Sequence, residues 1–185
     1  MVEHFFRHEY GRLVASLSCR VGVGHIEAVE DAVQTTLLKA MQASTPSGLP
    51  HKPSAWLYRV AFNELMGDFR QQNRHQQILK QFPEEIVKEN TESTQEHLLP
   101  DEMQDDLLRM LFATCDENIP LESQLVFALK ILCGFSVKEI VHRLFTSEAN
   151  VYKRLSRARD RLREQEILHE DLTAQQKSAR LPAVN

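Results

Sequence analysis

The sequence predicts an all-α protein of two small helical domains joined by an acidic linker. Apolar residues recur at helical spacing along most of the chain, and no stretch shows the alternation typical of a half-buried strand. From Pro83 to Glu117 the chain is rich in Asp and Glu, and only Lys88 and Arg109 oppose them. We expect a first domain over 1–80, the linker over 81–102, a second domain over 103–168 and, over 169–185, a tail or the start of a truncated extension.

Composition and charge narrow the class of protein. A length of 185 residues allows two small domains, and 42% apolar residues can fill packed cores. The net charge of −4 argues against attraction of the whole surface to DNA, so any nucleic-acid contact must be local. The cysteines Cys19, Cys115 and Cys133 form no CxxC pair, and we expect small buried thiols in a reducing compartment. Without a signal-peptide core or an apolar run of ~20 residues, we expect a cytoplasmic protein with no membrane span.

The first half of the chain predicts three helices. They run from about Glu3 to Arg20, from about Ile26 to Gln42, and from Pro53 to the polar run 71–77. Gly22 and Gly24 separate the first two helices, and a Pro- and Ser-rich loop precedes the third. Proline fits the first turn of a helix, which is where Pro53 stands.

The second predicted helix has an unusual polar side. Its polar side carries Glu27, Glu30, Asp31, Gln34 and Leu38. A leucine exposed among polar groups suggests a protein contact, although an ordinary solvated helix with one stray leucine is the alternative.

The second half predicts a helix-turn-helix. A helix over Met103–Cys115 and another from Pro120 to Gly134 precede it. Ser136 and Glu139 have capping-box spacing at the start of a short amphipathic helix, and a break follows at Phe145–Ser147. A further helix then shows apolar residues at i, i+4, i+7 and i+11, namely Val151, Leu155, Ala158 and Leu162.

The other side of this last helix is cationic. Six basic residues crowd it, opposed only by Glu148 and Asp160. They are Lys153, Arg154, Arg157, Arg159, Arg161 and Arg163. A helix with one apolar and one cationic side, after a short helix and a sharp turn, suits the major groove of DNA. We expect Asn150, Lys153 and Arg157 to reach bases and Arg154 to reach phosphate; a solvated basic face is the alternative.

The third helix carries residue types that capture unstacked bases and hold a nucleic-acid backbone. They are Trp56, Tyr58, Arg59, Phe62, Asn63, Arg70 and Arg74. We expect Trp56 and Phe62 to belong to the core. Asn63 and the polar loop over 44–52 are the better candidates for base capture.

In three places, in order along the chain, the sequence resembles the extracytoplasmic-function sigma factors of the sigma-70 family. Glu30–Gln34 with Leu37 and Leu38 is similar to the helix that binds the clamp helices of the polymerase β′ subunit. Pro53–Asn63 with Asp68 and Arg70 is similar to the region that melts and reads the −10 element. Ser147–Val151 with Arg154–Arg159 is similar to the recognition helix for the −35 element. The segment Asp101–Cys115 also resembles a subgroup with a C-terminal extension, which we expect to be absent here.

The resemblance implies a sigma factor that binds core RNA polymerase, through the β′ clamp helices and the β flap, and directs it to promoters. The implied residues are Glu30, Asp31, Gln34 and Leu38 for polymerase; Arg59, Asn63, Arg70 and Arg74 for the −10 element; and Ser147, Asn150, Lys153, Arg154 and Arg157 for the −35 element. An anti-sigma factor or the chain's own extension would be a further partner.

Other functions stay open from the residues alone. The alternative is a stand-alone helix-turn-helix regulator that binds a palindromic site as a dimer; an interaction protein would leave the cationic helix unexplained. The acidic linker is either a solubilising spacer or a mimic of single-stranded nucleic acid that threads a polymerase channel. No nucleophile elbow, P-loop or metal cluster is legible, so we expect no enzyme activity, no cofactor and no metal.

Overall fold

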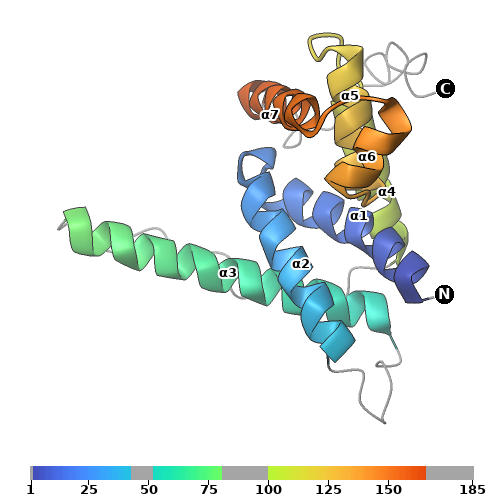
Figure 1. Cartoon of the computed structure of the whole chain (residues 1–185). Coiled ribbons are helices and arrows are strands. Elements are labelled where there is room, and N and C mark those ends of the chain that lie inside the picture. Colours follow the sequence, from blue (N-terminus) through green and yellow to red (C-terminus); the bar gives the residue numbers. More distant parts are fainter. Residues whose placement is uncertain (1, 43–51, 81–99, 166–185) are drawn as a thin grey trace.

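The computed structural model describes residues 2–42, 52–80 and 100–165, and every regular element among them is a helix (Figure 1). This confirms the all-α class. The elements are α1 (Val2–Val21), η1 (Val23–His25), α2 (Ile26–Gln42), α3 (Pro53–Lys80), α4 (Pro100–Thr114), α5 (Leu121–Phe127), η3 (Ala128–Leu132), α6 (Val137–Leu144) and α7 (Glu148–Gln165). The loop over 43–51 and most of the predicted linker, 81–99, lie outside the described residues.

The N-terminal helices α1, α2 and α3 pack through their predicted apolar stripes. Leu13 and Leu17 of α1, Val33 of α2 and Leu57 and Leu65 of α3 are fully buried. Gly22, at φ 89°, adopts a backbone conformation that favours glycine and ends α1 before the short helix η1.

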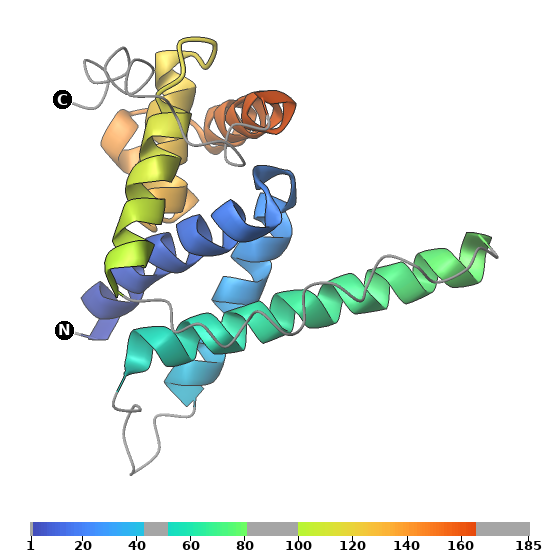
Figure 2. The same ribbon diagram turned by 180° about the vertical axis from the view of Figure 1, so that it is seen from behind.

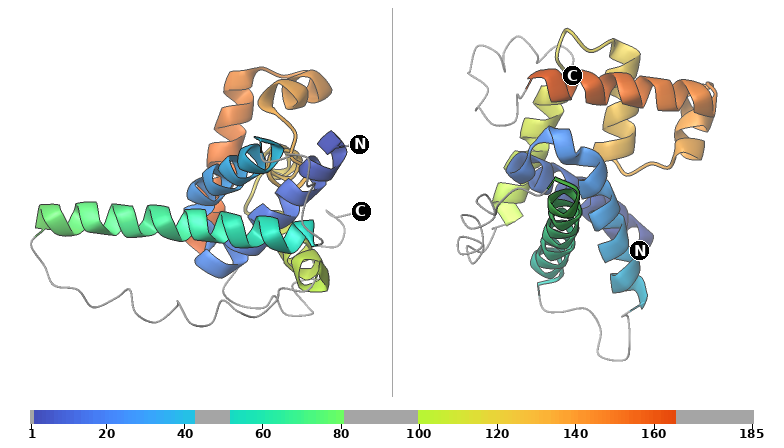
Figure 3. Two further views of the ribbon diagram at one scale, coloured as in Figure 1. Left: turned by 90° about the horizontal axis from the view of Figure 1, so that it is seen from below. Right: turned by 90° about the vertical axis from the view of Figure 1, so that its left-hand side faces the viewer.

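The far half of α3 extends away from the other described helices. Figure 3 shows this from below, and Figures 1 and 2 agree with it. The sequence predicts that this helix ends in the polar run 71–77, and the structure continues it to Lys80. Every residue from Arg70 to Arg74 is exposed. Polar residues can continue a helix beyond its packed portion because backbone hydrogen bonds need no apolar face.

The C-terminal helices α5, η3, α6 and α7 form a helix-turn-helix with a core of its own. Val126, Ile140, Val151 and Leu155 are buried together. The helix predicted from Pro120 to Gly134 differs in one respect, because the five residues of η3 form a π-helix. The change occurs where η3 meets α1, since a Cβ built at Gly11 would lie 2.0 Å from the Leu132 carbonyl oxygen. Gly134, at φ 67°, ends this segment as predicted.

A larger core joins the two halves. Ala158 and Leu162 of α7 and Phe127 and Ile131 of the preceding helices belong to the same buried cluster as the N-terminal helices. The helix α4 crosses α1 (Figure 2) and packs against it, and the Ser16 hydroxyl donates to Asp106 Oδ2 at 2.7 Å. The described halves therefore pack against each other through apolar contacts.

The cysteines follow the sequence-based expectation only in part. Cys115 is buried, and burial raises the pKa of the Cys19 thiol to about 12, so that it stays protonated at neutral pH. The expectation is wrong for Cys133, which is exposed at the end of η3. Within the described ranges no group of His, Cys, Asp and Glu is placed to hold a metal ion, and no helix is long and apolar enough to cross a membrane.

Candidate polymerase and nucleic-acid interfaces

The helix α6 begins with the predicted capping box. The Glu139 backbone N–H donates to Ser136 Oγ at 3.3 Å, and the Ser136 backbone N–H donates to Glu139 Oε2 at 2.8 Å. The Ser136 backbone N–H and the Ser136 hydroxyl, which also donates to Glu139 Oε2 at 2.8 Å, lower the pKa of Glu139 to about 2, with a smaller contribution from Arg7. Arg7 of α1 also donates to Glu139 Oε1 at 2.9 Å, so α1 touches the first turn of α6.

The turn between α6 and α7 centres on Phe145. Its φ of 47° is left-handed, and the Thr146 N–H donates to the Val141 carbonyl oxygen at 3.2 Å, as in a Schellman motif. Glycine usually fills this position because a Cβ is strained there. The Phe145 side chain is 93% exposed, so burial of the ring does not compensate for that strain.

The helix α7 starts immediately after this turn and presents the predicted DNA-binding residues. The Ser147 hydroxyl accepts the Asn150 backbone N–H at 3.3 Å, so Ser147 is the N-cap, a role the sequence analysis missed. Asn150, Lys153 and Arg157 are exposed and Arg154 is half-buried. Asn150, Arg154 and Arg157 follow one another at i, i+4 and i+7 and so share one side of the helix.

The four predicted −10 residues of α3 also share one side of their helix. Arg59, Asn63, Arg70 and Arg74 are separated by four, seven and four residues, which places them within about 60° around the helix axis. All four are exposed. Phe62 is buried, as expected for a core residue, and Trp56 packs partly buried against the same core.

On α2 the structure separates the four predicted polymerase-binding residues. Asp31, Gln34 and Leu38 are exposed, with Leu38 59% exposed. The prediction that Glu30 lies on the exposed side is wrong, because the Glu30 residue is 5% exposed. The cause is contact with other elements rather than the spacing within α2.

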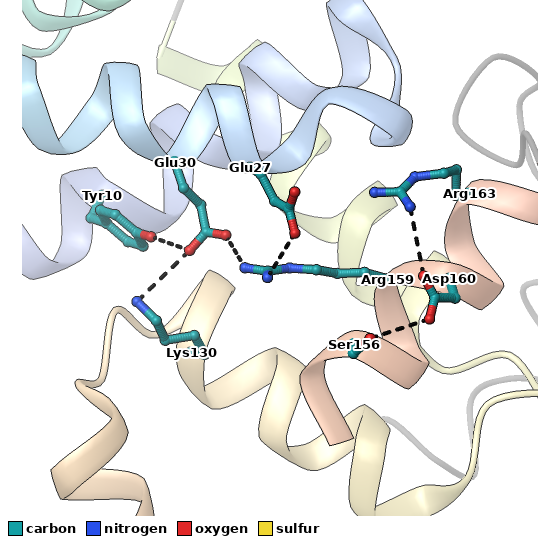
Figure 4. Close-up of polar contacts among 8 residues, drawn as sticks. All are labelled: Tyr10, Glu27, Glu30, Lys130, Ser156, Arg159, Asp160 and Arg163. Carbon is teal, nitrogen blue, oxygen red and sulfur yellow. Dashed lines mark hydrogen bonds and ion pairs between the residues drawn. The ribbon is translucent and has the colours of Figure 1, made fainter. Parts of the chain in front are cut away.

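Glu30 is surrounded by donors from three elements (Figure 4). Its Oε1 accepts from the Tyr10 hydroxyl at 2.9 Å and lies 3.7 Å from Lys130 Nζ. Its Oε2 pairs with Arg159 Nη2 of α7, and Arg159 Nη1 lies 3.2 Å from Glu27 Oε1. Burial and the neighbouring Glu30 carboxylate raise the pKa of Tyr10, which therefore stays a donor. We call these five residues the Glu30 cluster: Tyr10, Glu27, Glu30, Lys130 and Arg159.

Arg159 is one of the six cationic residues of its helix, and its pairing with Glu30 is not predicted by the sequence. Arg159 follows Ala158 of the apolar stripe, so it borders the packed side rather than the outer side. The position of Arg159 beside the apolar stripe could have predicted that it contacts another element. The sequence could not predict that the contact is Glu30, because Glu30 lies 129 residues away.

Comparison with known proteins agrees with the order of these elements. The family model for sigma-70 region 2 matches residues 6–75, and the model for sigma-70 region 4 matches residues 109–162. The first therefore covers α1, α2 and most of α3, and the second covers the helix-turn-helix. No solved structure matches the chain.

Two curated relatives carry the same regions. An uncharacterized protein of Rhizobium meliloti (strain 1021) is 30% identical over 165 residues, which are 86% of this chain and 38% of that protein. The ECF RNA polymerase sigma factor SigL of Mycobacterium tuberculosis is 30% identical over 133 residues, which are 71% of each chain. With both regions in order, the chain belongs to the extracytoplasmic-function sigma factors of the sigma-70 family, helix-turn-helix DNA-binding proteins of transcription initiation.

Proposed function

We propose that this chain binds core RNA polymerase through the β′ clamp helices and the β flap and directs it to promoters with −10 and −35 elements. The observation that carries the proposal is the side of α7 opposite its packed stripe. This side presents Asn150, Lys153 and Arg157, and α7 follows α6, whose first turn has a complete capping box. In a helix-turn-helix this side of the second helix enters the major groove.

At the −35 element each residue type has a defined role. Arginine pairs with the O6 and N7 atoms of guanine, and asparagine pairs with the N6 and N7 atoms of adenine. Arg157 and Asn150 are therefore proposed to reach bases, with Lys153 beside them. Arg154, on the flank, and the Ser147 hydroxyl, at the helix N-terminus, suit phosphate oxygens.

At the −10 element we propose that the side of α3 bearing Arg59, Asn63, Arg70 and Arg74 holds the melted strand. Arg59 and Arg74 are 15 residues apart. Because an α-helix rises about 1.5 Å per residue, this side is about 22 Å long. The arginines neutralise phosphates along that length, and the Asn63 amide can hydrogen-bond an unstacked base. Support comes from the shared helix side and from the exposure of all four residues.

On α2 we propose that Asp31, Gln34 and Leu38 contact the polymerase clamp, whereas the buried Glu30 fixes this helix through its pairs with Tyr10 and Arg159. An exposed leucine between polar groups is the chemistry of a protein contact with an apolar centre and a polar rim. Neither DNA-binding side needs high affinity alone, since attachment to one polymerase raises the effective concentration of both.

The test is reconstituted run-off transcription with purified core polymerase and a genomic promoter library. We expect Arg157→Ala to weaken use of the −35 element by about 1–3 kcal/mol, roughly 10- to 100-fold, with core binding unchanged. Arg163→Ala, which removes an exposed arginine of the same helix about 120° around its axis from Arg157, serves as the matched control. Equal loss of promoter use and core binding in Arg157→Ala would contradict its role, and failure of the wild-type chain to bind core polymerase would contradict the function.

A further inference from the structure

One large aromatic side chain of α7 lies outside its buried stripe. Tyr152 is 58% exposed, whereas Val151, Leu155 and Leu162 of the same helix are buried. A single exposed aromatic residue is ordinary on a protein surface, so its position on the helix decides whether it has a role. Tyr152 lies in the first turns of α7, and these are the turns of a recognition helix that contact base edges in the major groove.

The spacing of residues along α7 places Tyr152 around the helix axis. Because an α-helix turns about 100° per residue, Lys153 lies almost opposite the buried stripe and marks the middle of the outer side. Asn150 and Arg157 lie on one flank of Lys153, and Tyr152 lies about 100° away on the other flank. The two flanks therefore differ in chemistry, since one bears hydrogen-bond donors and the other bears an aromatic ring.

Only small side chains stand between Tyr152 and the middle of the outer side. Ala149 precedes it by three residues and Ser156 follows it by four, so both are its neighbours on the helix surface. Both residues are exposed, and both side chains are much shorter than that of tyrosine. Neither can therefore screen the ring from a groove that α7 enters.

The contact between α7 and α2 leaves this part of the flank open. Arg159 of the Glu30 cluster lies on nearly the same flank, but it is seven residues further along the helix, or about 10 Å along the axis. The helix α2 therefore meets the later part of α7, and the Tyr152 ring stays exposed nearer the start of the helix.

The major groove of DNA offers an apolar group that such a ring can recognise, the C5-methyl group of thymine. The amide of Asn150, the ammonium of Lys153 and the guanidinium of Arg157 suit hydrogen-bond acceptors rather than a methyl group. An aromatic ring, in contrast, packs against a methyl group and excludes water from it, as phenylalanine does in other protein–DNA contacts. Tyrosine presents the same ring with a hydroxyl group at its far end.

We propose that Tyr152 recognises thymine in the −35 element by packing its ring against the C5-methyl group. The contact adds a preference for A·T pairs that depends on the thymine rather than on the adenine. The inference rests on the proposed function, since that function places α7 in the major groove of the −35 element. A ring that served a protein contact, or a hydroxyl that bound only a phosphate oxygen, would give different results in the experiment below.

Replacement of thymine by deoxyuridine tests the contact, because deoxyuridine lacks only the methyl group. The assay measures binding of the holoenzyme, this chain with core polymerase, to duplex promoters found by run-off transcription, with each thymine of the −35 element replaced in turn. At one thymine or more we expect replacement to weaken binding about fourfold, as the loss of one buried methyl group would. A −35 element without any A·T pair, or one at which no replacement weakens binding, would overturn the proposal.

A double-mutant cycle then assigns that methyl group to Tyr152. In Tyr152→Ala we expect weaker binding to the thymine promoter and no further loss when deoxyuridine takes the same position. Tyr152→Phe keeps the ring and should depend on the methyl group as the wild type does. Phe145→Ala, which removes an exposed ring from outside α7, is the matched control and should also keep this dependence. Each ratio compares two DNAs on one protein, so a loss of folded protein cancels.

Three results would overturn the proposal. If Tyr152→Ala keeps the full dependence on the methyl group, another residue contacts it. If Tyr152→Phe binds both DNAs as weakly as Tyr152→Ala does, the hydroxyl and not the ring makes the contact. If Tyr152→Ala weakens binding to core polymerase without DNA, the ring belongs to a protein contact. In all three cases the wild-type holoenzyme still uses its promoters and the proposed function stands, whereas a wild-type chain that fails to bind core polymerase would remove the proposed function itself.

Discussion

At the scale of single residues, Phe145 departs most from what its position favours. It combines a left-handed backbone with an exposed ring, in a turn that usually contains glycine. Neither feature stabilises the fold. The strain lies in the backbone rather than in the ring. A pair of substitutions can separate the effect of the backbone from the effect of the ring.

We expect Phe145→Gly to stabilise the chain by about 0.5–1 kcal/mol, because relief of left-handed strain exceeds the added entropy of an unfolded glycine. Phe145→Ala keeps a Cβ and should leave the free energy of unfolding nearly unchanged. Urea denaturation measures both. Equal effects of glycine and alanine would show that the ring, not the backbone, determines stability at this position.

Glu139 gives a residue-scale prediction about pH. Its pKa is lowered to about 2 from an ordinary value of 4.5, so its charge stabilises the folded chain fully above pH 4.5. That contribution is lost as the pH falls through about 2. Glu139→Gln keeps a capping amide but lacks the charge, and we expect it to be less stable by under about 1 kcal/mol at neutral pH, because the site is partly exposed.

The measurement is the difference in thermal stability between wild type and Glu139→Gln as a function of pH. We expect a constant difference from pH 7 to about 5 and a shrinking one below 4.5. A difference that grows with acid would mean that the protonated carboxyl, not the carboxylate, is the better cap.

At the scale of elements, the side of α3 that bears Arg59, Asn63, Arg70 and Arg74 yields a prediction about salt. For single-stranded DNA the slope of log K against log salt changes by about 0.7 for each phosphate neutralised. We expect Arg70→Ala/Arg74→Ala to lower the slope for holoenzyme binding to a −10 oligonucleotide by about 1.4. Arg70→Lys/Arg74→Lys should restore it, and an unchanged slope in the alanine variant would place the phosphates elsewhere.

Local spacing was enough to predict most elements. The α6 capping box, the break before α7 and the apolar stripes of α1, α2 and α7 all depend on residues within a few positions of one another. The π-helical turn of η3 and the burial of Glu30 were not predictable in this way. The first lies where η3 meets Gly11 of α1, and the second depends on a pairing with Arg159, so both involve elements far apart in sequence.

At the scale of the whole molecule, the joint core ties the stability of the two halves together. The periodicity of the sequence predicts which side of α7 is buried. It does not predict that this side packs into two separate cores. Val151 and Leu155 pack within the helix-turn-helix, whereas Ala158 and Leu162 pack with the N-terminal helices. The division falls within one helix, so α7 belongs to both halves.

We therefore expect Leu162→Ala, at a fully buried position, to destabilise both halves by about 2–5 kcal/mol. Trp56 fluorescence follows the N-terminal half and hydrogen exchange of α7 amides follows the C-terminal half. Leu125→Ala, at a site that is 45% exposed, is the control and should cost under about 0.5 kcal/mol. Separate transitions, with only α7 affected, would mean that the halves unfold independently.

The core that joins the two halves leaves no room for a side-chain carbon at Gly11. Any other amino acid introduces a carbon that would lie 2.0 Å from the Leu132 oxygen, between two backbones that cannot turn aside as a side chain can. Gly11→Ala is therefore the smallest substitution that creates this clash. It would force the backbones of α1 and η3 apart while leaving every charged and DNA-facing group of the protein unchanged, and so disturb the joint core by the addition of one methyl group.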